Sequence, residues 1–339
     1  MKSFVILTAL LSISLLQACG VLENSPEGDH YTVTDSTQIY LVNIGQDSIK
    51  RLADGVHPLF LSKTERVLYG NRDSLLTIQF DGKNESLVAY IQGADFNSIS
   101  ISKDEQTALV VANNGAYNSL IKVDLNNGVT QSLTDSTSKY ISSPKFYLHD
   151  SRIIYWESRA GKSILSSIDV NGNAYQRVPT DSSFFLFIGS TDDDNILAME
   201  TYYSYPESSA STISLLDPVD FTVQDTIILH DRIVPNLSAK LTNDMKLCYS
   251  SSYNNLYELD LSTKRETTLF QGSVGDAYAI SDDLKIAVLA GNEIQLIDLI
   301  ARTQRSYLLR IGIGWYLYAN ISHDNRYFAV VKYIHTESF

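Results

Sequence analysis

The chain has 339 residues and carries 39 Asp and Glu against 26 Lys and Arg, which gives a formal net charge of −13 at pH 7. This acidic balance excludes nucleic acid as a partner, because too few basic groups are present to replace the counterions around phosphates. The length is large for one domain, although all-β architectures of this size commonly fold as a single unit.

Residues 1–18 have the pattern of a secretory signal peptide. Lys2 precedes an apolar run from Phe4 to Leu16, which is shorter than the roughly 20 apolar residues of a transmembrane helix. The run ends in LQACG at 16–20, which resembles the lipobox of bacterial lipoproteins. The resemblance implies that Cys19 is lipidated and becomes the mature N-terminus. An ordinary secretory signal with a chance cysteine is the alternative.

Residues 19–31 are predicted to be a flexible tether, since Pro, Gly, Asn and acidic residues follow the cysteine. Enteric lipoproteins that stay at the inner membrane carry aspartate directly after the lipidated cysteine, where this chain has Gly20. The resemblance therefore favours the outer membrane. We expect a cell-envelope protein that the lipid anchors without a membrane span, facing either the periplasm or the medium.

From residue 32 onward, the sequence repeats itself with a period of 36 to 48 residues. The first mark of each period is an apolar strand that ends in a polar, usually acidic residue and is followed in most copies by a turn. The polar position is occupied in turn by Asn43, Gln79, Asp124, Asp169, Asp217, Asp260 and Asp298. Seven copies of one strand type are thus expected.

The second mark is a turn, usually with a central carboxylate, that leads into another apolar strand. Its copies lie at 62–70, 102–112, 148–156, 190–199, 242–250, 281–290 and 322–331. Short outer-strand candidates such as 86–91 and 266–270 lie between the marks, so that each period supplies four strands. No stretch after residue 20 shows sustained helical periodicity.

Four short antiparallel strands bury both faces only when the units stack radially, which also leaves few open edges. We therefore predict an all-β fold for residues 32–339, a seven-bladed β-propeller with four-stranded antiparallel blades. Pairing of the N-terminal segment 39–52 with the C-terminal segment 316–333 would close the ring. Over about 32–334, the strand and Ser-x-Asp turn pattern resembles the TolB-like and WD-repeat-like propellers of bacteria, a resemblance that implies an architecture and no activity.

Catalytic motifs are sparse in this sequence. No G-x-S-x-G string is present, and the carboxylates of the repeat are interpreted as acceptors for backbone donors in turns. The six histidines show no H-x-H or HExxH spacing, so no metal site and no cofactor are predicted, although different blades could bring two histidines together. Cys248 lies in a strand-like run and is interpreted as a small buried residue.

The fourth period is the longest, with 48 residues from Asp169 to Asp217. Its insertion, between the second and third strands, presents tyrosines that favour recognition because they offer rigid contact area at low entropic cost. The predicted binding loops, all between second and third strands, hold Tyr117, Arg159, Tyr202, Tyr203, Tyr205 and Tyr253. Local packing of these tyrosines on neighbouring blades is the alternative.

Three functions are compatible with these patterns. The first is a non-enzymatic binding or scaffolding module for an envelope protein, a peptide or a glycan. The second is a propeller hydrolase or lactonase with a carboxylate or a metal ion in the central channel. The third is a structural part of a larger envelope assembly. The sequence favours the binding module, because it requires only the features described above.

Replacing Cys19 with Ala is expected to abolish lipid attachment and to move the protein from the membrane fraction to the soluble fraction, because the acyl chains provide the anchor. Incorporation of labelled palmitate and membrane fractionation measure both effects. The matched Cys248→Ala variant should keep its label. A Cys19→Ala variant that still incorporates palmitate would contradict the lipidation of Cys19 that the lipobox resemblance implies.

Overall fold

The protein is described by a computed structural model that covers residues 32–113, 115, 117–134, 140–159, 162–178, 185–191, 197–202, 211–229, 239–250, 255–271, 277–290, 293–307 and 316–338. The predicted signal peptide and tether lie outside this part of the chain. Residues Asp35–His335 form one compact unit. Apart from a single 3-10 turn, η1 (Ser62–Thr64), its described elements are β-strands, which confirms the all-β prediction.

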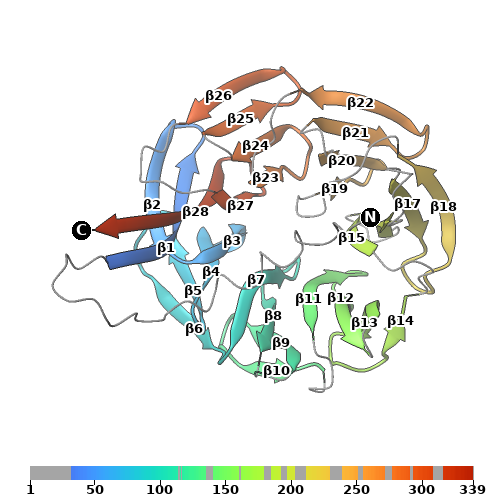
Figure 1. Ribbon diagram of the computed structural model, residues 1–339, viewed down its shortest axis with the longest axis horizontal. Coiled ribbons are helices and arrows are strands. Elements are labelled where there is room, and N and C mark those ends of the chain that lie inside the picture. Colours follow the sequence, from blue (N-terminus) through green and yellow to red (C-terminus); the bar gives the residue numbers. More distant parts are fainter. Residues whose placement is uncertain are drawn as a thin grey trace, which may run out of the picture. The chain divides into compact units, whose positions relative to one another are not determined.

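The described strands form seven four-stranded sheets. We call the sheets β3–β6, β7–β10, β11–β14, β15–β18, β19–β22 and β23–β26 blades 1 to 6, and the sheet of β27, β28, β1 and β2 the closing blade. The strand pairings within the described sheets are antiparallel. Within Asp35–His335 the blades surround a common axis (Figure 1). The prediction of a propeller with four-stranded antiparallel blades is confirmed.

The innermost strands, nearest the axis, are β3 (Val56–Leu61), β7 (Ala94–Ile101), β11 (Ile141–Tyr147), β15 (Phe185–Ser190), β19 (Lys240–Leu241), β23 (Ala277–Ile280) and β27 (Tyr316–Ile321). The second strands are β4 (Arg66–Asn71), β8 (Thr107–Asn113), β12 (Arg152–Arg159), β16 (Leu197–Tyr202), β20 (Lys246–Ser250), β24 (Ile286–Ala290) and β28 (Tyr327–Ser338).

The third strands are β5 (Ser74–Gln79), β9 (Asn118–Asp124), β13 (Lys162–Asp169), β17 (Ser211–Leu216), β21 (Leu256–Asp260), β25 (Ile294–Asp298) and β1 (Thr32–Asn43). The outer strands are β6 (Ser86–Tyr90), β10 (Thr130–Ser132), β14 (Gln176–Arg177), β18 (Val223–Ile228), β22 (Arg265–Phe270), β26 (Thr303–Tyr307) and β2 (Ser48–Asp54). The first mark of the repeat thus corresponds to third strands and the second mark to second strands.

The closing blade combines strands from the two ends of the described chain. β1 lies beside β28, so that the order across the sheet is β2-β1-β28-β27. The predicted pairing of the N-terminal and C-terminal segments is therefore present. Hydrogen bonds between β1 and β28 hold the two ends of the described chain together, so that neither strand is left as an open edge.

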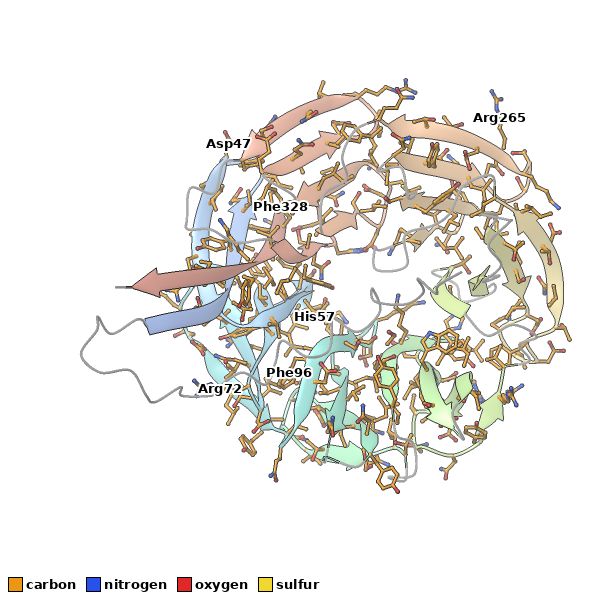
Figure 2. The ribbon with its side chains drawn as sticks, viewed as in Figure 1. Asp47, His57, Arg72, Phe96, Arg265 and Phe328 are labelled. Carbon is orange, nitrogen blue, oxygen red and sulfur yellow. The ribbon has the colours of Figure 1, made fainter. Side chains whose placement is uncertain are left out.

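Clusters of buried hydrophobic side chains lie between neighbouring blades. Leu68 and Leu75 of blade 1 meet Val110 and Val123 of blade 2, and similar clusters fill the other contacts between adjacent blades, including both sides of the closing blade. Phe328 belongs to the cluster between blade 6 and the closing blade (Figure 2). Both faces of each sheet are thereby removed from water.

Four of the described turns between innermost and second strands, those of blades 2, 5 and 6 and of the closing blade, share a Ser/Thr-x-Asp motif. In blade 2, the Ser102 hydroxyl donates to Asp104 over 2.6 Å and accepts a hydrogen bond from the backbone N–H of Thr107 at 3.0 Å. The hydroxyls of Thr242, Ser281 and Ser322 bond in the same way to the carboxylates two residues later. The side chains of this motif therefore fix the turn that starts the second strand.

The acidic residues that end the third strands have the predicted structural role. The Asp298 carboxylate accepts hydrogen bonds from the backbone N–H groups of Ile300 and Ala301 at 2.9 and 2.7 Å, and the carboxylates of Asp124, Asp169, Asp217 and Asp260 accept comparable bonds. Cys248 is buried, as expected, and burial raises the pKa of its thiol.

Gly70 of β4 lies directly against Phe96 of blade 2, which is also buried between the blades (Figure 2). A Cβ at position 70 would overlap the Phe96 side chain. We expect Gly70→Ala to lower the free energy of unfolding by about 1–3 kcal/mol, since overpacking forces neighbours out of place. Urea unfolding measures the effect. Gly45→Ala is the control, because its Cβ would come no closer than 3.7 Å to a neighbouring atom, and an equal loss in both variants would contradict the packing argument.

Candidate functional site

Two opposite sides of the propeller follow from the alternating strand directions. The loop face carries the connections between second and third strands and the first residues of the innermost strands. The turn face carries the turns between innermost and second strands and those between third and outer strands. The position of a residue within its blade therefore determines the face of the propeller on which it lies.

His57 lies near the start of β3, at the inner edge of blade 1 (Figure 2). The register of β3 against β4 shifts between Val56 and Leu59, and His57 has a positive φ of 53°. A bulge of this kind re-aims a side chain locally. The imidazole packs on Tyr318 of β27 with ring centroids 4.1 Å apart, so that His57 joins blade 1 to the closing blade.

The environment of His57 keeps its ring neutral at pH 7. Burial lowers the pKa of the imidazole to about 4; a hydrogen bond to the backbone of Ile99 opposes this shift, and the charge of Lys145 adds to it. The same surroundings raise the pKa of Tyr318 through burial. A neutral imidazole that donates one N–H to a carbonyl retains one acceptor nitrogen.

Lys145 lies on β11, next to another register shift between Ser142 and Lys145. Its side chain is exposed, yet the surrounding protein and the charge of Lys240 together lower the pKa of its ammonium to about 8. Lys145 therefore remains mostly protonated at neutral pH while its charge is less well hydrated than that of a free lysine.

Lys240, on β19, forms an ion pair with Asp282 of blade 6. The other carboxylate oxygen of Asp282 lies 2.7 Å from Nδ1 of His323, in the closing blade. Burial raises the pKa of Asp282, but Lys240 and His323 lower it more, so that the net shift is downward. These three residues link the turn-face ends of blade 5, blade 6 and the closing blade.

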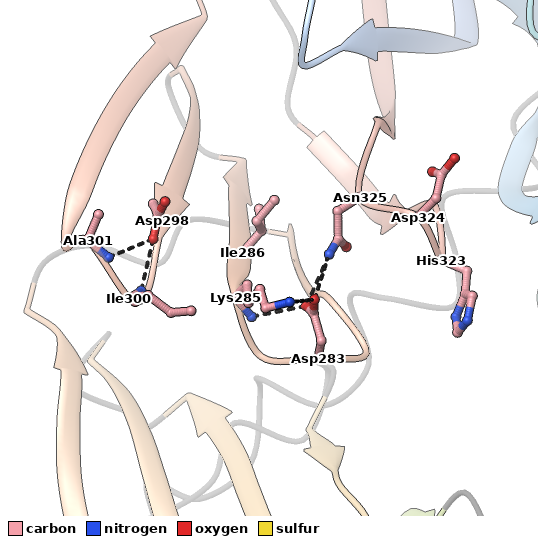
Figure 3. Close-up of a pocket in the computed structure, with 9 residues that line it drawn as sticks. All are labelled: Asp283, Lys285, Ile286, Asp298, Ile300, Ala301, His323, Asp324 and Asn325. Atoms are coloured by element: carbon pink, nitrogen blue, oxygen red, sulfur yellow. Dashed lines mark hydrogen bonds and ion pairs between the residues drawn. The ribbon is translucent and has the colours of Figure 1, made fainter.

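A shallow depression on the turn face lies between blade 6 and the closing blade (Figure 3). Its carboxylates are already used by the protein: Asp283 accepts two hydrogen bonds from the Asn325 amide at 3.0 Å, and Asp298 holds the turn of β25 and β26. Hydrogen bonds from Lys285, Ser281 and Asn325 outweigh the effect of burial and hold the pKa of Asp283 at about 2. The depression is therefore formed by two turns whose carboxylates are bonded within the protein.

The predicted loop residues share one face as far as the structure describes them. Tyr117 is 38% exposed at the connection of β8 and β9. Arg159 ends β12 and Tyr202 ends β16, which places their backbones on the loop face, whereas Tyr203, Tyr205, Tyr253 and the lipidation candidate Cys19 lie outside the described residues.

Two further exposed tyrosines of the loop face were not predicted from the sequence. Tyr90 ends β6 and is 65% exposed, and Tyr140 directly precedes β11 and is 54% exposed. Tyr175, 46% exposed, precedes β14 and so lies toward the turn face. Three of the four exposed tyrosines among the described residues therefore lie on the loop face, on blades 1, 2 and 3.

The sequence also did not single out His57, Lys145 or Lys240. The only available signal was a lone basic residue within a short apolar strand, and that signal does not show which strands face the axis. In the part of the chain that the structure describes, no group of three His, Cys, Asp or Glu side chains is placed to hold a metal ion. Within the same ranges, no helix has the length and apolar character needed to cross a bilayer.

No protein-family model and no curated protein matches the chain. Solved structures are similar in fold. An oligogalacturonate lyase in complex with manganese has a TM-score of 0.62 at 12% identity, covering 86% of this chain and 82% of that one. A putative TolB from Agrobacterium tumefaciens has a TM-score of 0.54 at 12% identity, covering 89% and 99%.

TolB from Acinetobacter baumannii has a TM-score of 0.51 at 14% identity; the match covers 70% of this chain and 64% of that one, less than two thirds of its length. At these identities the similarity shows the fold alone. The TolB-like propeller fold inferred from the repeat is supported by these neighbours.

His57 is expected to titrate with a pKa of about 4, which NMR of its ring signals measures, with His57→Gln for assignment. Because this value lies below the unfolded-state value of about 6.5, the unfolded chain takes up the proton first, and His57 should destabilise the fold as the pH falls from about 6.5 to about 4. Lys145→Met should raise the pKa of His57. A midpoint of 6.5 or above would contradict the described packing.

Proposed function

We propose that the protein is a lipid-anchored envelope propeller that acts as a non-enzymatic binding or scaffolding module for a protein, a peptide or a glycan. Its binding surface is the loop face. The N-terminal pattern that ends in Cys19 supports the anchor and the envelope location, with the outer membrane favoured. The TolB-like fold supports the propeller architecture.

The observation that carries this proposal is the concentration of exposed tyrosines on the loop face. Tyr90, Tyr117 and Tyr140 come from three consecutive blades. The side-chain amide of Asn118, next to Tyr117, contacts the carbonyl of Ile141, next to Tyr140, at 3.5 Å, so that two of these positions are neighbours across a blade boundary. Tyrosine combines a large rigid apolar surface with a polar hydroxyl, and this combination suits recognition.

The same face includes Arg159, Tyr202, Tyr203, Tyr205 and Tyr253 in this proposal. Their loops join second to third strands in blades 3, 4 and 5, beside the described tyrosines of blades 1 to 3. Together they would give a continuous rim on the loop face. A rim made from several blades binds a ligand larger than any single loop could contact.

The alternative is a hydrolase or lactonase that uses a carboxylate or a metal ion at the axis. The innermost strands present mainly basic groups in the described part of the chain, namely His57, Lys145 and Lys240 against one carboxylate, Asp95. Ammonium groups repel a cation, and one imidazole with one carboxylate supplies fewer than the three protein ligands of a typical catalytic zinc site. A stoichiometric divalent ion in the purified protein would support the enzyme instead.

Replacing Tyr90, Tyr117 and Tyr140 together with Ala is expected to reduce capture of the envelope partner by at least tenfold, because aromatic anchors carry much of the energy of an interface. The measurement is in-cell cross-linking of the anchored protein, followed by quantification of the captured partner. The matched control replaces Val219, Val223 and Ile300 with Ala, which are 62%, 61% and 70% exposed toward the turn face.

Equal capture by the tyrosine variant and the native protein would remove the loop face from the proposal. Loss of capture only in the turn-face control would move the binding surface to the opposite side. Both variants must show native unfolding curves for the comparison to count, and the exposure of all six side chains makes large effects on stability unexpected.

A further inference from the structure

The N-terminal strand of the closing blade enters the propeller at the loop face. β1 occupies the third position of its blade, and third strands run from the loop face to the turn face. The backbone carbonyl of Thr37, in β1, accepts a hydrogen bond from the N–H of Gly55 at 3.0 Å. Gly55 connects the outer strand β2 to the innermost strand β3 and so lies on the loop face. Thr37 therefore marks the loop-face end of the part of β1 that belongs to the ring.

This point of entry is fixed by the closure of the ring. β1 lies between β28 and β2 and is hydrogen-bonded to both. Ile39 and Leu41 are buried against blade 1, whereas Tyr40 and Val42 are buried against blade 6. A pull along β1 is opposed by the hydrogen bonds on both of its sides, so that the point of entry stays at the loop face while the ring remains closed.

The distance in sequence between the lipidation candidate and this point is short. Thr37 follows Cys19 by 18 residues. A chain of this length spans at most about 60 Å when fully extended, and a flexible one has an r.m.s. end-to-end distance of about 23 Å. An eight-residue second strand such as β12 covers about 25 Å between the two faces. A lipid on Cys19 therefore holds the loop face nearer to the bilayer than the turn face.

The two faces expose different kinds of large side chains. Tyr90, Tyr117 and Tyr140, which we call the loop-face tyrosines, lie on the face from which β1 starts. The exposed Val219 and Ile300 lie on the turn face. Tyrosine is enriched in protein interfaces because its ring is apolar and its hydroxyl is polar. The face nearer to the anchor thus carries the side chains that are better suited to recognition.

We propose that the loop face is turned toward the membrane that holds the lipid anchor and binds a protein embedded in that membrane. This inference rests on the proposed function as a lipid-anchored binding module and names its partner class. Anchoring both molecules in one bilayer raises their effective concentration without any new contact. A few tyrosine contacts then suffice for stable association.

The charge of the chain favours a protein over the lipid surface as the occupant. Anionic headgroups attract clusters of Lys and Arg, whereas this chain has a net charge of −13. In the turn between β4 and β5, Arg72 is followed by Asp73, and Glu293 lies in the equivalent connection of blade 6. Since neither connection has a basic cluster, an anionic bilayer gains no electrostatic attraction from them.

The first test measures the orientation of the lipidated full chain in vesicles of phosphatidylethanolamine and phosphatidylglycerol. In a Cys248→Ala background, a dye is attached at Tyr90→Cys on the loop face or at Lys83→Cys. Lys83 is the matched site because it is exposed in the turn between β5 and β6, on the turn face of the same blade. Energy transfer to acceptors on the lipid headgroups should be at least twofold greater from position 90. Equal transfer from both positions, or greater transfer from position 83, would overturn the orientation.

The second test asks whether the partner shares the membrane of the anchor. In-cell cross-linking compares the lipidated protein with a version that is secreted through a cleavable signal in place of residues 1–19. The unanchored version should capture at least tenfold less partner, because the effective concentration is lost. Insertion of 30 Gly and Ser residues after Gly20 should lower capture only severalfold. The captured protein is expected to stay in the membrane fraction after a carbonate wash.

Equal capture by the anchored and unanchored versions, or capture of a protein that the carbonate wash releases, would overturn the membrane-embedded partner. Capture of a glycan alone would also overturn it. Vesicles without protein provide a further check. If the unlipidated protein binds them and replacement of the loop-face tyrosines with Ala abolishes this binding, the occupant is the lipid surface, which would overturn the proposed protein partner.

Failure of this inference is distinguishable from failure of the proposed function. If the unanchored version captures its partner fully but replacement of the loop-face tyrosines removes capture, the membrane-embedded partner is overturned and the binding module stands. If capture depends on the anchor but not on the loop-face tyrosines, the loop face is overturned as the binding surface in both proposals.

Discussion

The packing of each blade against two neighbours is the constraint on which the rest of the structure depends. A four-stranded sheet of this propeller has two apolar faces, and water reaches one of them wherever a neighbour is missing. Every blade therefore needs the ring to be closed. The pairing of β1 with β28 meets this requirement, since it places Ile39 and Leu41 in the cluster with blade 1 and Tyr40 and Val42 in the cluster with blade 6.

A closed ring of blades needs ordered turns within and between the blades, and many of the carboxylates of the chain hold those turns. Many of the described turns are held by an Asp of the same blade, and several turns are joined to the next blade. Glu105 accepts the backbone N–H groups of Ser62 and Lys63, and Asp150 accepts that of Lys103. A hydrogen bond from the Ser102 hydroxyl, and then one from the backbone N–H of Gln106, lower the pKa of Asp104 because both stabilise its charged form. Much of the negative charge of the chain is thus structural, which fits the absence of a catalytic motif in the repeat.

The sequence predicted the second and third strands, because their repeated apolar runs and turn residues are local signals. It also identified the structural carboxylates and the burial of Cys248. The axial groups were not predicted, since His57 and Tyr318 meet only through closure of the ring and the bulges of β3 and β11 have no periodic pattern. The loop face was predicted in part: Tyr117 follows a second strand and was found, whereas Tyr90 and Tyr140 flank outer and innermost strands and were missed.

The acidic balance of the chain sets physical limits on what the propeller binds. The surface charge repels anions at long range, but at physiological salt this repulsion decays over about 8 Å. At short range a charge that the surrounding protein partly encloses is less well hydrated, as burial and the charge of Lys240 make that of Lys145, and its interactions are stronger than those of a surface charge. Added salt screens the exposed surface charge more than a partly enclosed contact. An anion that reaches the axis despite this repulsion therefore gains its affinity from the few groups that the bulges and the closed ring hold in place.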